Sequence, residues 1–427
     1  MDLPYSTKTS PLGGQLKRRI EDFQVEEILE DGTICAIEQL NLNPPPRINL
    51  SIPENPNPRK FDQLHVRMEK FNIETTFAIR NLSRGTGNSV KRIGYAGLKD
   101  KRALTCQRIS MWRPEIEKLK RFGMRGIALH HAEWSDQRID LGDARGNKFR
   151  ITIRDIPHMM GDTEKRIQEF SNTLVNGIPN YYGEQRFGGI RNITHVVGKL
   201  LLEGKMEEAV MEYLTKPSEG EEDIVAEARK NLKDTHDFPR ALKEFPDKMH
   251  FEVIMLNQLV QVPTDFAGAF QRLPQKTRYL FTHAYQSHLF NLIVAERVKK
   301  GLLYPMDGDV LENGIPTALL PGSQTAIAKG IPGDIEQGVL TKEGVHPKLF
   351  NNPKLGELSS WGARKPILLR VHDFQLEKVE KDAFYEGKTA ATVSFWLDKG
   401  AYATTALREL MKNDQLPIVS TNETEEN

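Results

Sequence analysis

The segment from Gly94 to Ser110 constrains this chain more than any other. It reads Gly-Tyr-Ala-Gly-Leu-Lys-Asp-Lys-Arg-Ala-Leu-Thr-Cys-Gln-Arg-Ile-Ser. Two glycines precede a single carboxylate, Asp100, which stands among cations and is followed by an alternating run. This pattern predicts a strand, a loop that carries Asp100, and a second, half-exposed strand. Catalytic groups concentrate on loops held by rigid strands, although a lone aspartate in a basic loop is also typical of a turn or a solvated ion pair.

The length and composition of the chain favour a two-domain globular protein. At 427 residues it is too long for one ordinary hydrophobic core. A hydrophobic content of 38% with 27% charged residues is typical of a folded protein. The net charge of +1 gives no general attraction to a polyanion, so a nucleic-acid surface would need the 59 lysines and arginines to gather locally.

Cysteine usage and hydropathy favour the cytoplasm. With only Cys35 and Cys106, a disulfide framework and a Cys-x-x-Cys pair are excluded, and a reducing compartment fits best. The first residues lack the apolar core of a signal peptide, and no apolar run approaches membrane-spanning length. A cytoplasmic protein is therefore expected.

Periodicity and turn signals predict a mixture of strands and helices. Glu30-Asp31-Gly32 separates two β-prone runs, so a hairpin is expected over 23–40. His130 and His131 are expected on a strand, with one side chain in and one out, in preference to a metal site. Residues 305–362, rich in Gly and Pro, are expected to form small strands and loops. Further strands are expected at 92–97, 126–134, 148–155, 367–374 and 391–397, and helices at 75–82, 163–174, 222–233, 276–300 and 402–412.

A second informative segment, Asn180-Tyr-Tyr-Gly-Glu-Gln-Arg-Phe-Gly-Gly, spans residues 180–189. Its glycines predict a flexible loop. Aromatic faces stack on bases, and an arginine neutralises a phosphate or pairs with a carboxylate. The same composition is typical of a surface turn with two half-buried tyrosines, so the residues alone leave both interpretations open.

Five motifs together resemble the TruD family of tRNA pseudouridine synthases, with an archaeal-type member expected. The segment 96–107 is similar to the family signature Ala-Gly-x-Lys-Asp-x-x-Ala-x-Thr-x-Gln, and every fixed position is filled. The segment 180–188 is similar to a second motif, Asn-[Tyr/Phe]-[Tyr/Phe]-Gly-x-Gln-Arg-Phe-Gly. The other three lie at 21–26 (Glu-Asp-Phe-Gln-Val-Glu), 283–291 and 400–409. Because the motifs follow the family's order, the resemblance covers nearly the whole chain.

The resemblance implies that the chain isomerises uridine to pseudouridine in tRNA, in this family at position 13. The C1′–N1 bond breaks, the uracil turns over, and a C1′–C5 bond forms, without redox change, cofactor or metal ion. No nucleotide-binding loop or His-Glu-x-x-His pair occurs in the sequence. The catalytic residue is then Asp100, which could attack C1′, add to C6, or remove the C2′ proton to form a glycal. All three routes stay open, and the glycal is our hypothesis for the first step.

The resemblance also implies which residues bind the substrate. Tyr182 occupies the position of the ring that stacks on the extruded base, and Phe23 is a candidate second wall. Asn180 is expected to form a hydrogen bond with Asp100 or with the uracil edge.

The carboxylate of Asp100 must stay ionised beside RNA phosphates, so a neighbouring cation is expected. Lys99, Arg186 and Arg408 are the candidates. Because adjacent side chains of an extended segment point opposite ways, Lys99 is the weakest of the three. Basic residues expected to line the RNA groove are Lys91, Arg92, Lys101, Arg102 and Arg191.

The fold implied by the resemblance is α+β. A pseudouridine-synthase catalytic domain, with a mixed sheet, helices and a central cleft, would be formed by residues 1–205 and 366–427. An inserted α+β TRUD domain would occupy residues 206–365. The expected partner is tRNA, bound by a monomer that uses no small-molecule cofactor and touches no membrane.

Two other functions compete with this interpretation. A non-catalytic RNA-binding protein on the same fold would bind RNA in the same way but leave no modified base. A glycoside or nucleoside hydrolase normally needs two carboxylates at a defined separation. The signature loop offers only Asp100, and the second motif adds only Glu184.

Overall fold

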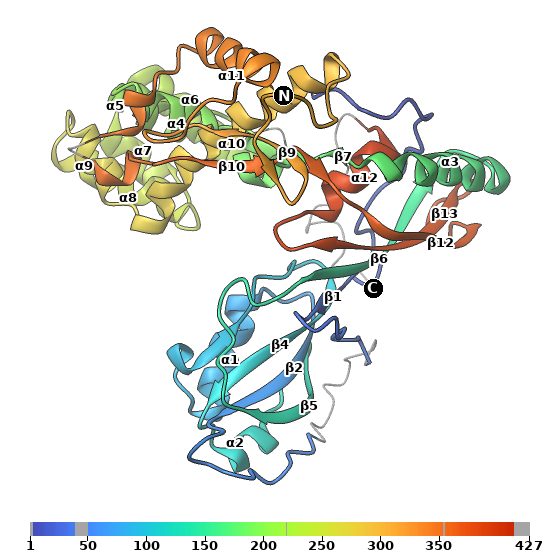
Figure 1. Cartoon of the computed structure of the whole chain (residues 1–427). Helices are drawn as coiled ribbons and strands as arrows, with labels where there is room; N and C mark the ends of the chain where they lie inside the picture. The colour runs from blue at the N-terminus through green and yellow to red at the C-terminus, as the bar shows by residue number, and fades with distance from the viewer. Residues whose placement is uncertain (1–2, 39–49, 219, 353–354, 414–427) are drawn as a thin grey trace. The chain divides into compact units, whose positions relative to one another are not determined.

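The computed structural model describes residues 3–38, 50–218, 220–352 and 355–413, which form two compact units (Figure 1). One, the helical unit, comprises Pro179 to Leu368 together with Leu3 to Ser6. The other, the sheet unit, comprises Thr7 to Ile178 and Leu369 to Asn413. Helices and a mixed sheet are both present, so the predicted α+β class is confirmed. The predicted insertion at 206–365 lies within the helical unit, and its limits stay a prediction.

The sheet unit is built on one eight-stranded sheet with the order β12-β13-β6-β1-β4-β2-β5, and β3 is paired to β4. All neighbours run antiparallel except β1 and β4, which are parallel. The strands are β1 (Phe23–Ile28), β2 (Gln63–Phe71), β3 (Ile93–Tyr95), β4 (Leu104–Trp112), β5 (Ile127–Ser135), β6 (Gly146–Ile156), β12 (His372–Lys381) and β13 (Thr389–Asp398).

Strand β4 is central because three strands pair with it. β2 follows one edge of β4, while β1 and β3 share the other edge, β1 at 104–106 and β3 at 109–111. The expectation of a half-exposed strand after Asp100 is wrong, since every residue of β4 is buried except Arg108 and Trp112. The alternating residues of β4 do point to two different faces of the sheet, but side chains on both faces are buried.

Four helices cover the sheet and close two hydrophobic cores. α1 (Thr75–Thr86) and α2 (Ile116–Arg121) pack on β2, β4 and β5. α3 (Met160–Thr173) and α12 (Ala403–Met411) pack on β1, β6 and β13. The helices predicted at 75–82, 163–174 and 402–412 are confirmed.

The hairpin expected over 23–40 forms only in part. The chain turns at Gly32, whose φ of 87° favours glycine, and one bridge joins Ile28 to Ile34. β6 occupies one edge of β1, and β4 occupies the other as far as Glu26. The second run can therefore pair only with the end of β1. Residues 39 and 40 lie outside the described residues.

Strand β5 contains a bulge at His131. Arg67 of β2 pairs with His130 whereas His65 pairs with Glu133, so β5 holds one extra residue, and His131 adopts a φ of 51°. Both imidazole rings lie beside one carboxylate, that of Glu38. The expectation of one histidine in and one out agrees with their burial, since the His130 side chain is 11% exposed and that of His131 52%. Both rings nevertheless reach the same carboxylate, because a bulge interrupts the alternation of side chains.

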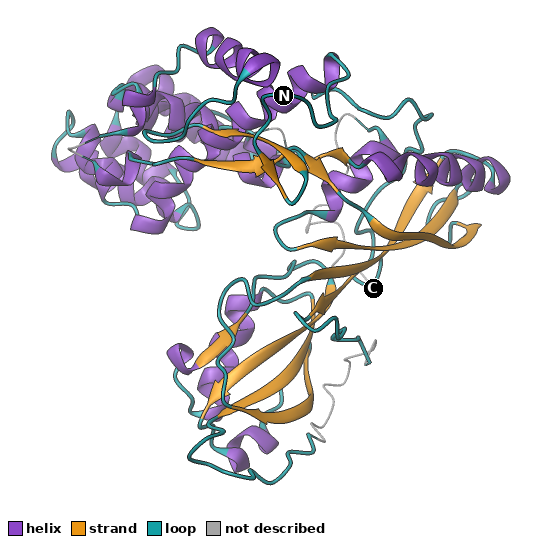
Figure 2. Ribbon diagram, viewed as in Figure 1, coloured by secondary structure: helices purple, strands orange, loops and turns teal. Residues whose placement is uncertain are grey.

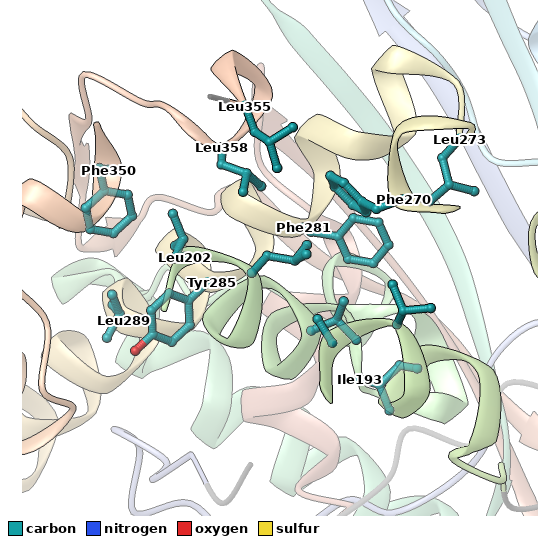
Figure 3. Close-up of a cluster of buried hydrophobic side chains, with 14 of the residues drawn as sticks. Ile193, Leu202, Phe270, Leu273, Phe281, Tyr285, Leu289, Phe350, Leu355 and Leu358 are labelled. Atoms are coloured by element: carbon teal, nitrogen blue, oxygen red, sulfur yellow. The ribbon is translucent and has the colours of Figure 1, made fainter. Parts of the chain in front are cut away.

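The helical unit surrounds the long helix α10 (Gln275–Lys299) and carries a small sheet of order β10-β9-β8 (Figure 2). Figure 3 shows part of its core, in which Phe281, Tyr285 and Leu289 of α10 lie among apolar side chains of other segments. The remaining elements are α4 (Thr194–Leu202), α5 (Met206–Thr215), α6 (Asp223–Thr235), α7 (Phe238–Glu244), α8 (His250–Gln261), α9 (Phe266–Gln271), α11 (Gly330–Lys342), β8 (Leu311–Glu312), β9 (Ile315–Leu320) and β10 (Ala363–Pro366).

The helices predicted at 222–233 and 276–300 are confirmed, but α11 falls where only strands and loops were expected. Its first turn holds Gly330, Pro332 and Gly333, which resemble a loop in sequence. Proline is tolerated there because the first amides of a helix have no intrahelical partner. Gly333 is needed because a Cβ would stand 2.1 Å from the Ala328 carbonyl oxygen.

The shorter elements include two strands at the crossings between the units and several 3-10 turns. Among the described residues, no helix is both long and apolar enough to cross a membrane. The short elements are β7 (Ile178–Pro179), β11 (Leu368–Leu369), η1 (Val90–Arg92), η2 (Leu174–Asn176), η3 (Glu184–Phe187), η4 (Gly189–Arg191), η5 (Pro347–Phe350) and η6 (Gly356–Leu358).

A pair of glycine substitutions tests how tightly α4 packs on α10. A Cβ at Gly198 would lie 2.1 Å from the Phe281 carbonyl oxygen, whereas a Cβ at Gly338 of α11 would meet nothing within 4 Å. Gly198→Ala should lower the free energy of unfolding by about 1–3 kcal/mol through overpacking. Gly338→Ala should raise it by up to about 1 kcal/mol through helix propensity. Urea unfolding of both variants measures this, and equal effects would contradict the close approach.

Candidate active site

The predicted catalytic residue, Asp100, lies on the loop between β3 and β4. Side chains from neighbouring elements hold the backbone of this loop. The Gln107 amide donates to the Gly97 carbonyl at 3.0 Å, and the backbone amide of Lys99 donates to Thr75 Oγ1 at 3.0 Å. These hydrogen bonds hold the loop that carries Asp100 in one conformation.

The Asp100 carboxylate pairs with a buried ammonium, that of Lys17, with 2.7 Å between Nζ and Oδ1. The Lys17 side chain is 4% exposed and that of Asp100 36%, so the carboxylate is open to solvent while its cation is enclosed. Lys17 Nζ also lies 4.1 Å from the ring centroid of Phe23, which is buried against Phe149. Arg102 donates to the Lys17 carbonyl at 2.9 Å and so holds this turn, where Lys17 has a φ of 59°.

The neighbouring lysines have other partners. Lys99 Nζ lies 2.8 Å from Glu27, a fully buried carboxylate, and donates to Asn147 at 2.6 Å. Lys70 Nζ donates to the backbone carbonyl of Asp100 at 2.8 Å. Burial lowers the pKa of Lys70 to about 7. We call Lys17, Phe23, Lys70, Lys99 and Asp100 the aspartate site.

Sequence reasoning missed Lys17 as the cation beside Asp100. Of the three expected cations, Lys99 turns away to Glu27, and Arg408 on α12 approaches Glu409 at 3.5 Å. Arg186 belongs to the helical unit. The only signal in the sequence is that Lys17 lies just before the Glu-Asp-Phe motif, and no spacing rule reveals that it would be buried.

The second motif forms a loop that α10 holds in place. The Asn291 side chain binds the backbone of Tyr182 twice, accepting from its amide at 2.8 Å and donating to its carbonyl at 2.9 Å. The Tyr182 ring meets Phe290 edge to face, with 5.5 Å between centroids. Arg186 donates to Ser287 Oγ at 2.9 Å, and its guanidinium lies 5.5 Å from the Tyr182 centroid.

A further cation, Lys365 of β10, is packed against this loop. Its ammonium donates to the Asn180 carbonyl at 2.8 Å and lies 4.6 Å from the Tyr182 centroid. Burial lowers the pKa of Lys365 to about 7. The Asn180 side chain donates to the Pro366 carbonyl at 3.0 Å, so its amide nitrogen is used within the helical unit. We call Asn180, Tyr182, Arg186, Phe290 and Lys365 the tyrosine site.

Two of the five basic residues expected to line an RNA groove have structural partners instead. Arg191 pairs with Glu252 at 3.2 Å, and Arg102 holds the Lys17 turn. Lys91, Arg92 and Lys101 are exposed.

Comparison with known proteins identifies the family of this chain. The family model described as tRNA pseudouridine synthase D (TruD) matches residues 3–314 and 312–410. A curated relative from Methanosarcina barkeri, named "Probable tRNA pseudouridine synthase D", is 36% identical and covers 97% of each chain. One from Methanosarcina mazei, with the same name, is 37% identical over 97% of each chain. The chain belongs to the TruD family.

The similarity includes the fold, as a solved structure of a TruD protein shows. A crystal structure of a TruD protein from Methanosarcina mazei superposes with a TM-score of 0.78 at 35% identity, covering 97% of this chain and 99% of that one. The four motifs of the TruD resemblance that surround the two sites are divided between the units. Those at 21–26 and 96–107 build the aspartate site, and those at 180–188 and 283–291 build the tyrosine site.

The low pKa of Lys365 makes a pH test of the tyrosine site possible. Its folded pKa of about 7 lies below the ordinary 10.5, so between these values the unfolded chain holds the extra proton. The contribution of Lys365 to stability therefore rises with pH from about 7 to 10 and is lost as pH falls through 7. Lys365→Met should remove this rise, measured as the melting temperature across that range.

The matched control is Lys230→Met, an exposed lysine on α6. It should keep the wild-type pH dependence. Loss of the bond to the Asn180 carbonyl lowers the stability of Lys365→Met by an amount that does not depend on pH, so the slope and not the absolute value decides. A wild-type slope in Lys365→Met would contradict the burial of this ammonium.

Proposed function

We propose that this TruD-family chain isomerises uridine to pseudouridine in tRNA, at position 13, with Asp100 as its catalytic residue. The observation that carries this proposal is the Asp100 carboxylate, half exposed on a rigid loop and paired with an enclosed ammonium. One ionised carboxylate is what each of the three first steps requires, whether attack at C1′, addition at C6 or removal of the C2′ proton. The isomerisation has no net change in atoms or electrons: the C1′–N1 bond breaks, a C1′–C5 bond forms, and C5 loses a proton while N1 gains one.

The proposed role of Lys17 is to keep Asp100 charged and aimed. RNA phosphates brought near the site disfavour a carboxylate, and an adjacent cation favours it. Because Lys17 is enclosed, its charge is screened less by water than that of a surface lysine. Phe23, under the Lys17 ammonium, is proposed to position this cation, and in this role it supports the site from the core instead of forming an open pocket wall.

The proposed role of the tyrosine site is to hold the extruded base. Stacking on an aromatic ring contributes ~1–3 kcal/mol per base. Tyr182 is suited to this because Asn291 fixes its backbone and Phe290 fixes its ring. We propose that Arg186 draws phosphates to this loop, that Lys365 holds the Asn180 backbone beneath it, that Asn180 contacts the uracil edge, and that Arg408 contacts the RNA.

We also propose a cellular compartment, a partner and an oligomeric state for this protein. The two cysteines are buried free thiols, which suits a reducing cytoplasm. We propose tRNA as the partner and a monomer as the working form, with residues 206–365 as the inserted domain.

Asp100→Asn tests the catalytic role directly. The change removes the charge but keeps the shape, so pseudouridine formation should be abolished while tRNA affinity stays within a few-fold. Carbodiimide mapping of treated tRNA and filter binding measure the two quantities. Asp140→Asn, an exposed aspartate of the same unit, is the control and should be fully active. Activity that survives in cleanly purified Asp100→Asn would show that Asp100 is not the catalytic residue. A wild-type protein that forms no pseudouridine would instead favour the non-catalytic RNA-binding alternative.

A comparison of Lys17→Met with Lys99→Met separates the two lysines. Lys17→Met takes the cation from Asp100, so kcat should fall on the order of 100-fold with a smaller change in melting temperature. Lys99→Met strands the buried Glu27 carboxylate, so stability should fall by about 3–5 kcal/mol while folded enzyme keeps most of its kcat. Adding Glu27→Gln to Lys99→Met should restore much of the stability. Equal losses of kcat in both single variants would contradict the assignment.

A further inference from the structure

A cluster of potential metal ligands lies on the sheet unit, away from the residues assigned above. It consists of Glu38, His130 and His131, whose nearest ligand atoms all lie within 4.8 Å of one another. The bulge in β5 creates this cluster, because without it the two histidines would point to opposite faces of the sheet. A histidine at a positive φ is uncommon, and such strained positions are enriched at functional sites.

The spacing between Glu38 and His130 suits a small divalent cation. Glu38 Oε2 lies 3.7 Å from His130 Nδ1, and Glu38 Oε1 contacts His131 Nε2 directly. Two ligands bound tetrahedrally to zinc at about 2.0–2.1 Å are separated by about 3.4 Å. The distance to Nδ1 is therefore too long for a hydrogen bond but close to that between two ligands of one ion.

The imidazole of His130 gives independent evidence for a bound metal ion. Its side chain is only 11% exposed, and Nδ1 is buried without a hydrogen-bond partner in the described part of the chain. A buried ring nitrogen is normally satisfied, so this one needs an explanation. A bound cation at Nδ1 supplies it.

The groups behind His130 have the chemistry of a supporting shell. Its other ring nitrogen, Nε2, faces the fully buried carboxylate of Glu69 at 3.6 Å and the Cys106 sulfur at 3.8 Å. A histidine that binds a metal through one nitrogen usually donates from the other to a carboxylate. Glu69 also accepts from the backbone amide of Glu38 at 3.0 Å, so one carboxylate orients two of the three ligands.

We propose that Glu38, His130 and His131 bind one divalent transition-metal ion of the zinc type, with water completing the coordination. Two imidazoles and a carboxylate are a donor set that zinc accepts readily. The ion would tie the segment that follows β1 to the edge strand β5. This site is independent of the proposed function, since none of its ligands belongs to the aspartate or the tyrosine site.

The proposal is tested by zinc binding to the purified full chain after treatment with EDTA. Affinity is measured by competition with a chromophoric chelator, and Co²⁺ replaces Zn²⁺ for a visible absorption spectrum. Wild type should bind one equivalent, with the intense bands of a four-coordinate cobalt site. Glu38→Gln and His131→Ala should each weaken zinc binding at least about 10-fold, and Glu69→Gln by about 10- to 100-fold. His250→Ala, an exposed histidine on α8, should bind as wild type does.

Glu38 and His131 are 44% and 52% exposed, so their substitution leaves the hydrophobic core unchanged. A circular-dichroism spectrum like that of the wild type confirms this for each variant. Equal zinc affinity in wild type and in the Glu38→Gln/His131→Ala double variant would overturn the proposal. It would make the cluster an ordinary histidine–carboxylate ion pair.

Discussion

The ion pair between Lys17 and Asp100 is the contact on which the aspartate site depends, and it joins segments 83 residues apart in the chain. Three ammonium groups gather beneath the Asp100 loop, and each has a different acceptor. Lys17 takes the exposed carboxylate of Asp100, Lys99 takes the buried carboxylate of Glu27, and Lys70 takes backbone carbonyls. An ammonium without such a partner would be expelled to solvent or would lose its proton. The division of partners therefore leaves one carboxylate accessible and paired with an enclosed cation.

The tyrosine site depends on one face of a helix in a comparable way. Ser287 and Asn291 are four residues apart on α10, so they lie on the same side of the helix and hold the loop at two points. Both are fully buried, so their hydrogen bonds to the loop are protected from water. In sequence, the polar residues of 283–291 are typical of a packing helix with a polar face. In the structure, this polar face holds the backbone of Tyr182 in place.

Local patterns in the sequence predicted local structure well, and long-range partners poorly. The helix around Phe281 and Leu289 and the loop at Asp100 follow from spacing alone, because periodicity and turn residues act within a few positions. The burial of β4 depends on β1, β2 and the helix α1, all distant in sequence, so the alternation within the strand could not reveal it. Lys17 was missed for the same reason. The contact of both His130 and His131 with Glu38 was missed because a bulge is decided by the pairing with β2, not by the dipeptide.

The register of β2 connects the two faces of the sheet unit. Glu69 and Lys70 are neighbours on this strand, paired with Cys106 and Thr105 of β4, so their side chains lie on opposite faces. One face receives the carboxylate behind His130, and the other receives the ammonium that holds the Asp100 carbonyl. A slip of one residue would exchange them. The ammonium would then face the histidines and the carboxylate would face a carbonyl oxygen, both unfavourable. Electrostatics on both faces therefore favours the same register as the apolar side chains of β2.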